Sequence, residues 1–167
     1  MTVEANVTAR MISRVFAPYA LIGLALLAAC APLGSAKPPV PVLNPAAITI
    51  TPPDQIHWSE ESNGALNAVL AGDPNKEGLY VTLVRWRAGH MSHPHFHPND
   101  RFITVISGTW WVGTGPKFDP ASTVPVKAGS FVVHKGKQIH YDGAKEGDAV
   151  LEIVGMGPAT ATPAEQK

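Results

Sequence analysis

The sequence has only one cysteine, Cys30, so no disulfide can form within the chain. The sequence also has no excess of charge of either sign, because basic and acidic residues number 13 each. That balance gives no basis for binding nucleic acid or an acidic membrane surface. The chain contains no internal repeat, no heptad pattern and no phosphate-binding glycine loop, and no serine stands in the setting of a nucleophile. The sequence therefore argues against a disulfide-stabilised protein, a repeat protein, a coiled coil, a P-loop nucleotide-binding protein and a serine hydrolase.

No apolar run reaches the roughly twenty residues of a transmembrane helix. The longest, residues 15–29, follows Arg10 and Arg14 and ends in small residues. A basic start, a short apolar run and a small-residue end are typical of a secretory signal, which we predict over residues 1–29. Met11 could equally be the start, because the sequence from there is a complete signal by itself.

Cys30 ends the sequence Leu-Ala-Ala-Cys, which resembles the bacterial lipobox. The resemblance implies that Cys30 carries a lipid and becomes the mature N-terminus, and Ala31 after it favours the outer membrane. The alternative is an ordinary signal cut after Ala36. Either way we expect an exported, periplasmic protein, with the lipid on Cys30 as its one membrane attachment.

Composition divides the rest of the chain into three parts. Residues 30–47 are rich in proline and alanine and predict an extended tether. Residues 48–157 form the folded domain. Residues 158–167 are small and polar, and we expect them to be a disordered tail.

The folded domain is predicted to be all-β. It has short apolar runs between turns, the chain as a whole has 16 prolines and 15 glycines, and no long helix is indicated. Residues 78–88 alternate as a half-buried strand does, whereas 64–71 fits a strand or a helical turn. The other expected strands cover residues 48–50, 101–107, 109–112, 129–134, 138–141 and 149–154, with a loop over 113–125. Such a pattern indicates a sandwich or a small barrel.

Four histidines, at positions 90, 93, 95 and 97, cluster between Gly89 and Gly108. Successive side chains of a strand point to opposite faces, so His93, His95 and His97 can line one side. Two imidazoles at i and i+2 can both reach one cation, as sites for transition metals require. A third ligand must then come from elsewhere in the chain.

Two segments resemble the motifs of the cupins. The first is Gly89-x5-His95-x-His97-x3-Arg101-x6-Gly108, and the second is Gly129-x10-His140. The resemblance implies a double-stranded β-helix, the cupin or jelly-roll barrel. It also implies that His95, His97 and His140 bind one divalent metal ion inside the barrel, with iron, manganese, zinc, copper and nickel as the candidates. Dimers are common in the family, and the pair Trp110-Trp111, of which one must point inward, is compatible with a homodimer.

The sequence departs from the family at Arg101, which stands where cupins have a glutamate ligand. A guanidinium offers no lone pair, so it cannot ligate a metal. Three arrangements are compatible with this residue. Arg101 holds an anionic substrate beside a three-histidine metal; another group, such as His93, Asp100 or water, takes the vacant position; or the site binds an anion without metal. Asp100 and Arg101 could also form a local ion pair. The second motif lacks the family's proline, glycine and asparagine.

His93, Asp100 and His134 are the further residues that could support the ligands or line the pocket. For His95, His97 and His140 the alternative to metal binding is a polar barrel interior that has lost its metal.

Two functions are consistent with these residues. One is a small exported metalloenzyme, a dioxygenase or another oxidoreductase, or an isomerase or lyase, that acts on a small anionic molecule oriented by Arg101 as the catalytic residue. The other is a non-catalytic periplasmic module that binds a metal or a small ligand, for example as a sensor. The fold cannot choose between them, since one fold hosts unrelated functions.

Overall fold

The structure, a computed structural model, describes residues 41–166. The predicted signal over 1–29, the lipobox at Cys30, the alternative cleavage after Ala36 and most of the tether lie outside the described residues. Within the described part of the chain, no helix is both long and apolar enough to cross a membrane.

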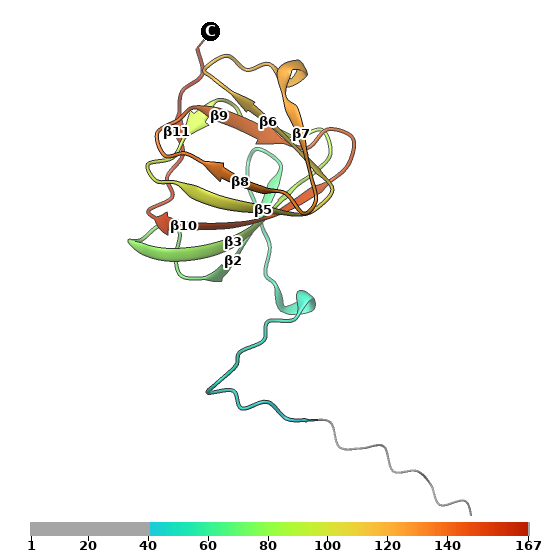
Figure 1. Ribbon diagram of the computed structural model, residues 1–167, viewed down its shortest axis with the longest axis vertical. Coiled ribbons are helices and arrows are strands. Elements are labelled where there is room, and N and C mark those ends of the chain that lie inside the picture. Colours follow the sequence, from blue (N-terminus) through green and yellow to red (C-terminus); the bar gives the residue numbers. More distant parts are fainter. Residues whose placement is uncertain (1–40, 167) are drawn as a thin grey trace, which may run out of the picture. The chain divides into compact units, whose positions relative to one another are not determined.

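Two antiparallel sheets make up the domain, as the all-β prediction requires (Figure 1). The six-stranded sheet has the order β1-β2-β3-β10-β5-β8, and the five-stranded sheet has the order β11-β4-β9-β6-β7. The strands are β1 (Ser59–Glu60), β2 (Ala65–Ala71), β3 (Gly78–Trp86), β4 (His95–Phe96), β5 (Arg101–Ser107), β6 (Thr109–Thr114), β7 (Val124–Lys127), β8 (Phe131–His134), β9 (His140–Gly143), β10 (Ala149–Gly157) and β11 (Thr162–Pro163). Two single 3₁₀ turns, η1 (Pro53–Gln55) and η2 (Pro120–Ser122), are the helical elements described.

The alternation in β3 shows how the sequence builds a wall of the barrel. Tyr80 and Trp86 point inward and are almost fully buried, whereas Leu79 on the opposite parity is 60% exposed. The core lies between the sheets and joins these side chains to others of β5, β6 and β10, namely Ile103, Val105, Trp110, Leu151 and Ile153. Burial of each such side chain contributes about 1.5–3 kcal/mol.

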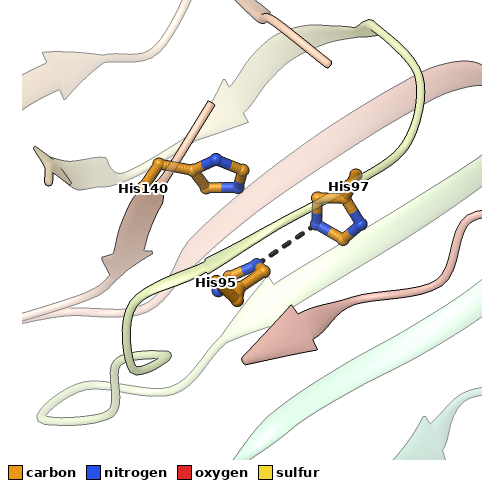
Figure 2. Close-up of side chains that lie close together, drawn as sticks. All are labelled: His95, His97 and His140. Atoms are coloured by element: carbon orange, nitrogen blue, oxygen red, sulfur yellow. Dashed lines mark hydrogen bonds between the residues drawn. The ribbon is translucent and has the colours of Figure 1, made fainter. Parts of the chain in front are cut away.

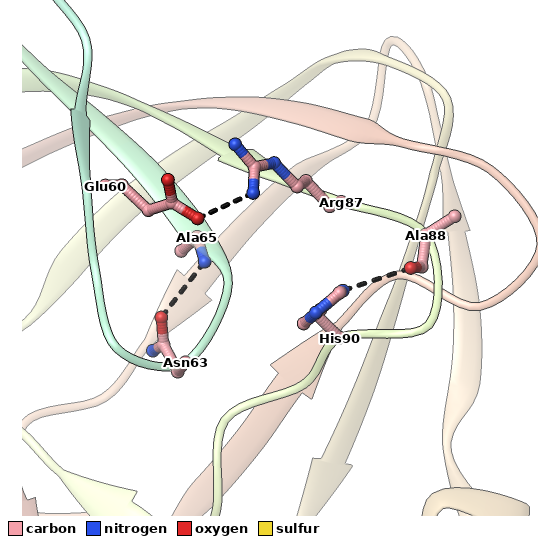
Figure 3. Close-up of polar contacts among 6 residues, drawn as sticks. All are labelled: Glu60, Asn63, Ala65, Arg87, Ala88 and His90. Atoms are coloured by element: carbon pink, nitrogen blue, oxygen red, sulfur yellow. Dashed lines mark hydrogen bonds and ion pairs between the residues drawn. The ribbon is translucent and has the colours of Figure 1, made fainter.

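The first two strands close one end of the six-stranded sheet through local polar contacts (Figure 3). Asn63 accepts a hydrogen bond from the amide of Ala65 at 3.1 Å, which fixes the turn from β1 into β2. Arg87, just after β3, forms an ion pair with Glu60 of β1 at 2.6 Å. These contacts hold β1 beside the sheet, although it has only two residues.

Two turns need a left-handed backbone. Gly108, with φ of 76°, joins β5 to β6, and a Cβ there would collide with the carbonyl oxygen of Asp148. Lys137, with φ of 63°, precedes β9 at the position where the cupin motif has glycine. Its amide donates to the carbonyl of His97 at 2.7 Å, so this strained turn is tied to the histidine segment.

The predicted inward and outward tryptophans are confirmed. Trp110 is completely buried and donates its indole N–H to Asp142 at 3.2 Å. Trp111 is half-buried on the other face of β6, with the Lys145 ammonium 3.8 Å from the centre of its ring.

Two expectations for local structure differ from the structure, and one open alternative is decided. Residues 48–50 form no strand, and the side chains of Ile48 and Ile50 are exposed because no neighbouring strand pairs with them. The loop expected over 113–125 ends in β7, which pairs with β6 from Val124 onward. Residues 64–71 are a strand and not a helical turn, since Ala65–Ala71 pairs along β3.

The expectation of a disordered tail over 158–167 is wrong for its described part, residues 158–166. β11 pairs antiparallel with β4, and the amides of Ala159, Ala164 and Gln166 donate to carbonyls of the domain at 2.7–2.9 Å. This segment is held by backbone hydrogen bonds and not by apolar side chains, which is why its composition resembles that of a tail.

Candidate metal centre

The pairing of two short strands brings the candidate ligands together. His95 of β4 lies directly opposite His140 of β9 in the ladder. His97 follows His95 by two residues, and each of the three histidines has a ring nitrogen within 4.8 Å of those of the other two. Figure 2 shows the three rings directed toward a common point. The structure thus brings together the three residues that the cupin resemblance implied.

Each of the three imidazoles uses its Nδ1 atom in the same way. The Nδ1 atoms of His95, His97 and His140 lie 2.8, 3.0 and 3.0 Å from the backbone carbonyls of residues 93, 160 and 138. A carbonyl can only accept a hydrogen bond, so each Nδ1 carries the proton. In a neutral imidazole the other nitrogen, Nε2, then has a free lone pair. All three rings are therefore held in the tautomer that binds metals through Nε2.

The Nε2 atoms have no protein partner that suits a lone pair. Those of His95 and His97 are 3.1 Å apart, the contact dashed in Figure 2, and neither nitrogen has a proton to donate to the other. Nε2 of His140 is buried without any hydrogen-bond partner. Two nitrogens bound to one metal at about 2.0–2.1 Å are about 3 Å apart. The donor set and its spacing fit a divalent metal ion.

Burial keeps the imidazoles of His97 and His140 neutral. It lowers the pKa of His97 to about 3, helped by the positive charge of Arg101. Burial also lowers the pKa of His140 to about 4, although the carboxylate of Asp142 opposes the shift. Both side chains are thus in the ligating form throughout the physiological pH range.

Asp142 is a site residue that the sequence reasoning missed. Its side chain is buried, accepts from Trp110, and lies with His134 and His140 in a second group whose possible ligand atoms are within 4.8 Å of one another. The signal was present, because His140-x-Asp142 has the same spacing on β9 as His95-x-His97. Residues i and i+2 of a strand share a face.

Arg101, at the start of β5, extends into the same region. It lines a cavity of about 390 Å³ together with His95 and His97, whereas His140 is not among the lining residues. Its Nη2 is 3.4 Å from Nδ1 of His134, and its Nε is buried without an acceptor. Burial lowers the pKa of Arg101, although Asp142 and Tyr80 oppose the shift. A guanidinium is so basic that the side chain is still charged at physiological pH.

The suggested Asp100–Arg101 ion pair does not form. Asp100 instead accepts from the amide of Gly136 at 2.8 Å and pairs with Lys135 at 3.3 Å. These contacts turn the Asp100 carboxylate away from the histidines. Asp100 therefore stabilises the β8–β9 turn, and Arg101 is the one of the two residues that lines the cavity.

His93 does not share a face with the other two histidines. Its ring contacts Phe118 and its Nδ1 is 2.9 Å from the carboxylate of Glu165. Pro94 interrupts the regular alternation between His93 and His95. The part of His93 that serves the site is its carbonyl, the acceptor for Nδ1 of His95.

The two other histidines of interest differ in setting. His134 of β8 is buried, with its ring centre 4.0 Å from that of His140 and its pKa lowered to about 2 by burial. His90 is exposed and its Nδ1 donates to the carbonyl of Ala88 (Figure 3). His134 therefore packs against the candidate ligand His140.

The cavity above the histidines has polar and apolar walls. Tyr80, Trp86 and Leu151 contribute apolar surface, and Asp142 lies near its floor. Asn63, Asn67 and other polar side chains from the β1–β2 end also line it. Its volume lies in the range of small-molecule sites.

Comparisons with known proteins identify the fold. No protein-family model matches the chain, and no curated protein matches it. Among solved structures, KdgF from a Halomonas species is 19% identical over 65% of this chain and 94% of its own, with a TM-score of 0.52. The polyketide cyclase RemF from Streptomyces resistomycificus is 13% identical over 72% and 87%, with a TM-score of 0.61. An RmlC-like cupin from Ralstonia eutropha is 17% identical over 65% and 68%, with a TM-score of 0.52.

At these identities the likeness concerns the fold. The chain has the double-stranded β-helix of the cupins, which confirms the predicted fold class.

Three buried neutral histidines predict loss of stability in acid. The pKa values of His97, His134 and His140 in the folded chain are lowered to about 3, 2 and 4. As the pH falls, these three histidines therefore bind protons in the unfolded chain before they do so in the folded chain. The stabilisation is complete above pH ~6.5 and falls as the pH drops toward 4, by about 1.4 kcal/mol per pH unit for each histidine. Denaturant unfolding in a chelating buffer from pH 8 to 4.5 measures it. His134→Gln should make the dependence of the unfolding free energy on pH shallower, and His57→Gln, at an exposed site, should not. An equal pH dependence in both variants would contradict the conclusion that His134 is buried in its neutral form.

Proposed function

We propose that this protein is a metalloenzyme of cupin type that binds one divalent metal ion through His95, His97 and His140. The observation that carries the proposal is the shared use of Nδ1: three backbone carbonyls hold the rings so that three Nε2 lone pairs converge. In a barrel interior that had lost its metal, two unprotonated nitrogens 3.1 Å apart would both lack a hydrogen-bond donor, which is unfavourable away from water.

Three neutral imidazoles are a donor set suited to iron, manganese, zinc, copper or nickel. When bound, such an ion acts as a Lewis acid or redox centre and leaves coordination positions for other molecules. The chemistry we favour is that of a dioxygenase or another oxidoreductase, with an isomerase or lyase as the alternative. The polyketide cyclase RemF, with a TM-score of 0.61 to this chain, is an enzyme with a similar fold, which supports a catalytic use of the barrel.

Arg101 is proposed to hold a small anionic substrate. Among residues 41–166 it makes no ion pair, and its Nε has no acceptor, so the buried cation has unused hydrogen-bonding capacity. Leaving such a group unpaired is costly. A carboxylate or enolate in the cavity of about 390 Å³ would accept from the guanidinium while it faces the histidines. Arg101 would thereby orient the substrate.

Metal content is the first test. Protein purified without a histidine tag should contain about one equivalent of metal by elemental analysis, because the chain offers one three-histidine set. The double variant His95→Ala/His140→Ala should lose it, while His90→Ala, which removes an exposed histidine of the same stretch, should keep it.

Folded protein that binds none of the five metals, even after incubation with them, would overturn the proposal. Stoichiometric metal without turnover of any small anion would favour the alternative of a non-catalytic binding or sensory module.

The role of Arg101 is tested by changing its charge. Arg101→Gln should weaken binding of a small carboxylate about 10- to 100-fold, because it removes a charge-assisted hydrogen bond in a buried site. Arg101→Glu should also tighten metal binding, since it restores the acid of the cupin motif. Arg87→Gln, at an exposed ion pair, is the control. Calorimetric titration gives both affinities, and unchanged metal affinity in Arg101→Glu would show that this side chain does not face the metal.

We also propose that the protein is exported and anchored in the outer membrane by a lipid on Cys30. Cys30→Ser should release the protein into the soluble periplasmic fraction and abolish incorporation of labelled fatty acid. Fractionation and labelling of cells expressing each form measure this. Release of the native protein as a soluble species would instead favour cleavage after Ala36.

A further inference from the structure

β4, which carries His95, has little support from its own sheet neighbours. It has two residues, and its ladder with β9 consists of the single pair His95–His140. Its other edge is covered by β11, where Thr162 pairs with Phe96 and Pro163 with His95. Without β11 this edge would have unpaired backbone groups and freedom to move.

Residues 159–166, which we call the C-terminal strap, are fastened to the domain at three points. The amide of Ala159 donates to the carbonyl of Pro74 at 2.7 Å, that of Ala164 to Pro94 at 2.9 Å, and that of Gln166 to Pro116 at 2.8 Å. These acceptors belong to three separate loops, so the strap has a defined path across the domain. Ala159 and Ala161 of the strap also line the cavity.

The strap contacts the groups that orient two of the three candidate ligands. The carbonyl of Thr160 accepts the Nδ1 proton of His97 at 3.0 Å. The carboxylate of Glu165 is 2.9 Å from the ring of His93, and the carbonyl of His93 in turn accepts from Nδ1 of His95. One segment of small and polar residues thus supports both histidines of the first motif.

We propose that the C-terminal strap is a positioning element of the metal site: docked on β4, it fixes the tautomer and direction of His97 through Thr160 and holds the segment that carries His95. This inference rests on the proposed metal binding. If the strap were absent, Nδ1 of His97 would lose its acceptor and either nitrogen could carry the proton. Loss of such supporting contacts lowers metal affinity 10- to 100-fold.

Two shortened chains test the proposal with Co²⁺ as the probe. A chain ending at Ala159 lacks all of the strap except its first residue, whereas a chain ending at Glu165 keeps both Thr160 and Glu165. We expect the first to bind Co²⁺ 10- to 100-fold more weakly and with an altered visible spectrum, and the second to bind within about 3-fold of the full chain. Circular dichroism in chelator checks that the barrel remains folded.

Equal Co²⁺ affinity and spectrum in the full chain and the chain ending at Ala159 would overturn the role of the strap and leave the metal site intact. A full chain that binds no Co²⁺ would instead overturn the metal proposal, and the strap's role with it. If the shorter chain does not fold, Ala164→Pro removes the bond to Pro94 in the full chain and should weaken Co²⁺ binding. Thr162→Ala, which changes only an exposed side chain, should not.

Linkage gives a reciprocal measurement on the unaltered protein. If the docked strap favours metal binding, bound metal must favour the docked strap by the same free energy. Hydrogen exchange at the amides of Ala164 and Gln166 should therefore slow when Co²⁺ is added, while the amide of Ser130, in a turn that has no hydrogen bond to the strap, should not change. Equal exchange at the strap amides with and without bound Co²⁺ would overturn the coupling.

Discussion

The site depends on hydrogen bonds from imidazole Nδ1 atoms to backbone carbonyls. An imidazole that is free to change tautomer has either a lone pair or a proton at Nε2 with little preference. Three such rings would rarely all have the lone pair at Nε2 at the same time. Here the acceptors are carbonyls, which cannot donate, so each ring has only one neutral form that satisfies the contact. The barrel supplies the low-dielectric surroundings that keep His97 and His140 uncharged. Ligand character is therefore set by the backbone path as much as by the presence of histidine.

Periodic signals in the sequence predicted the strands and the pair His95 and His97, whereas His140 came from the resemblance to the second cupin motif. Alternation in residues 78–88 reflects a barrel wall, and the i, i+2 pair lies at β4, with His97 directly after the strand. The inference failed where alternation is interrupted or no apolar residue marks the strand. Pro94 turns His93 outward, and the C-terminal strap is held by amides, which every residue has and composition cannot reveal.

Asp142 was missed for a different reason. A carboxylate that follows a histidine by two residues on a strand shares its face, but position 142 belongs to neither of the cupin motifs. Burial against Trp110 makes the carboxylate part of the site's electrostatics, because it raises the pKa values of both His140 and Arg101. The motif pattern therefore predicted the histidine nitrogens of the site but not the negative charge of Asp142 beside them.

The exchange of glutamate for Arg101 changes the electrostatic character of the pocket. In a site with three histidines and a glutamate, one ligand charge offsets part of the charge of a dication. Here Arg101 adds a positive charge instead, and the charge of Asp142 opposes it. If the site binds a dication as we propose, the charge of that ion would stay uncompensated by these two residues. In a partly apolar cavity, such an excess would favour an anion over a neutral molecule. Under the proposed function, charge would therefore matter more than shape in the choice of ligand by this cavity.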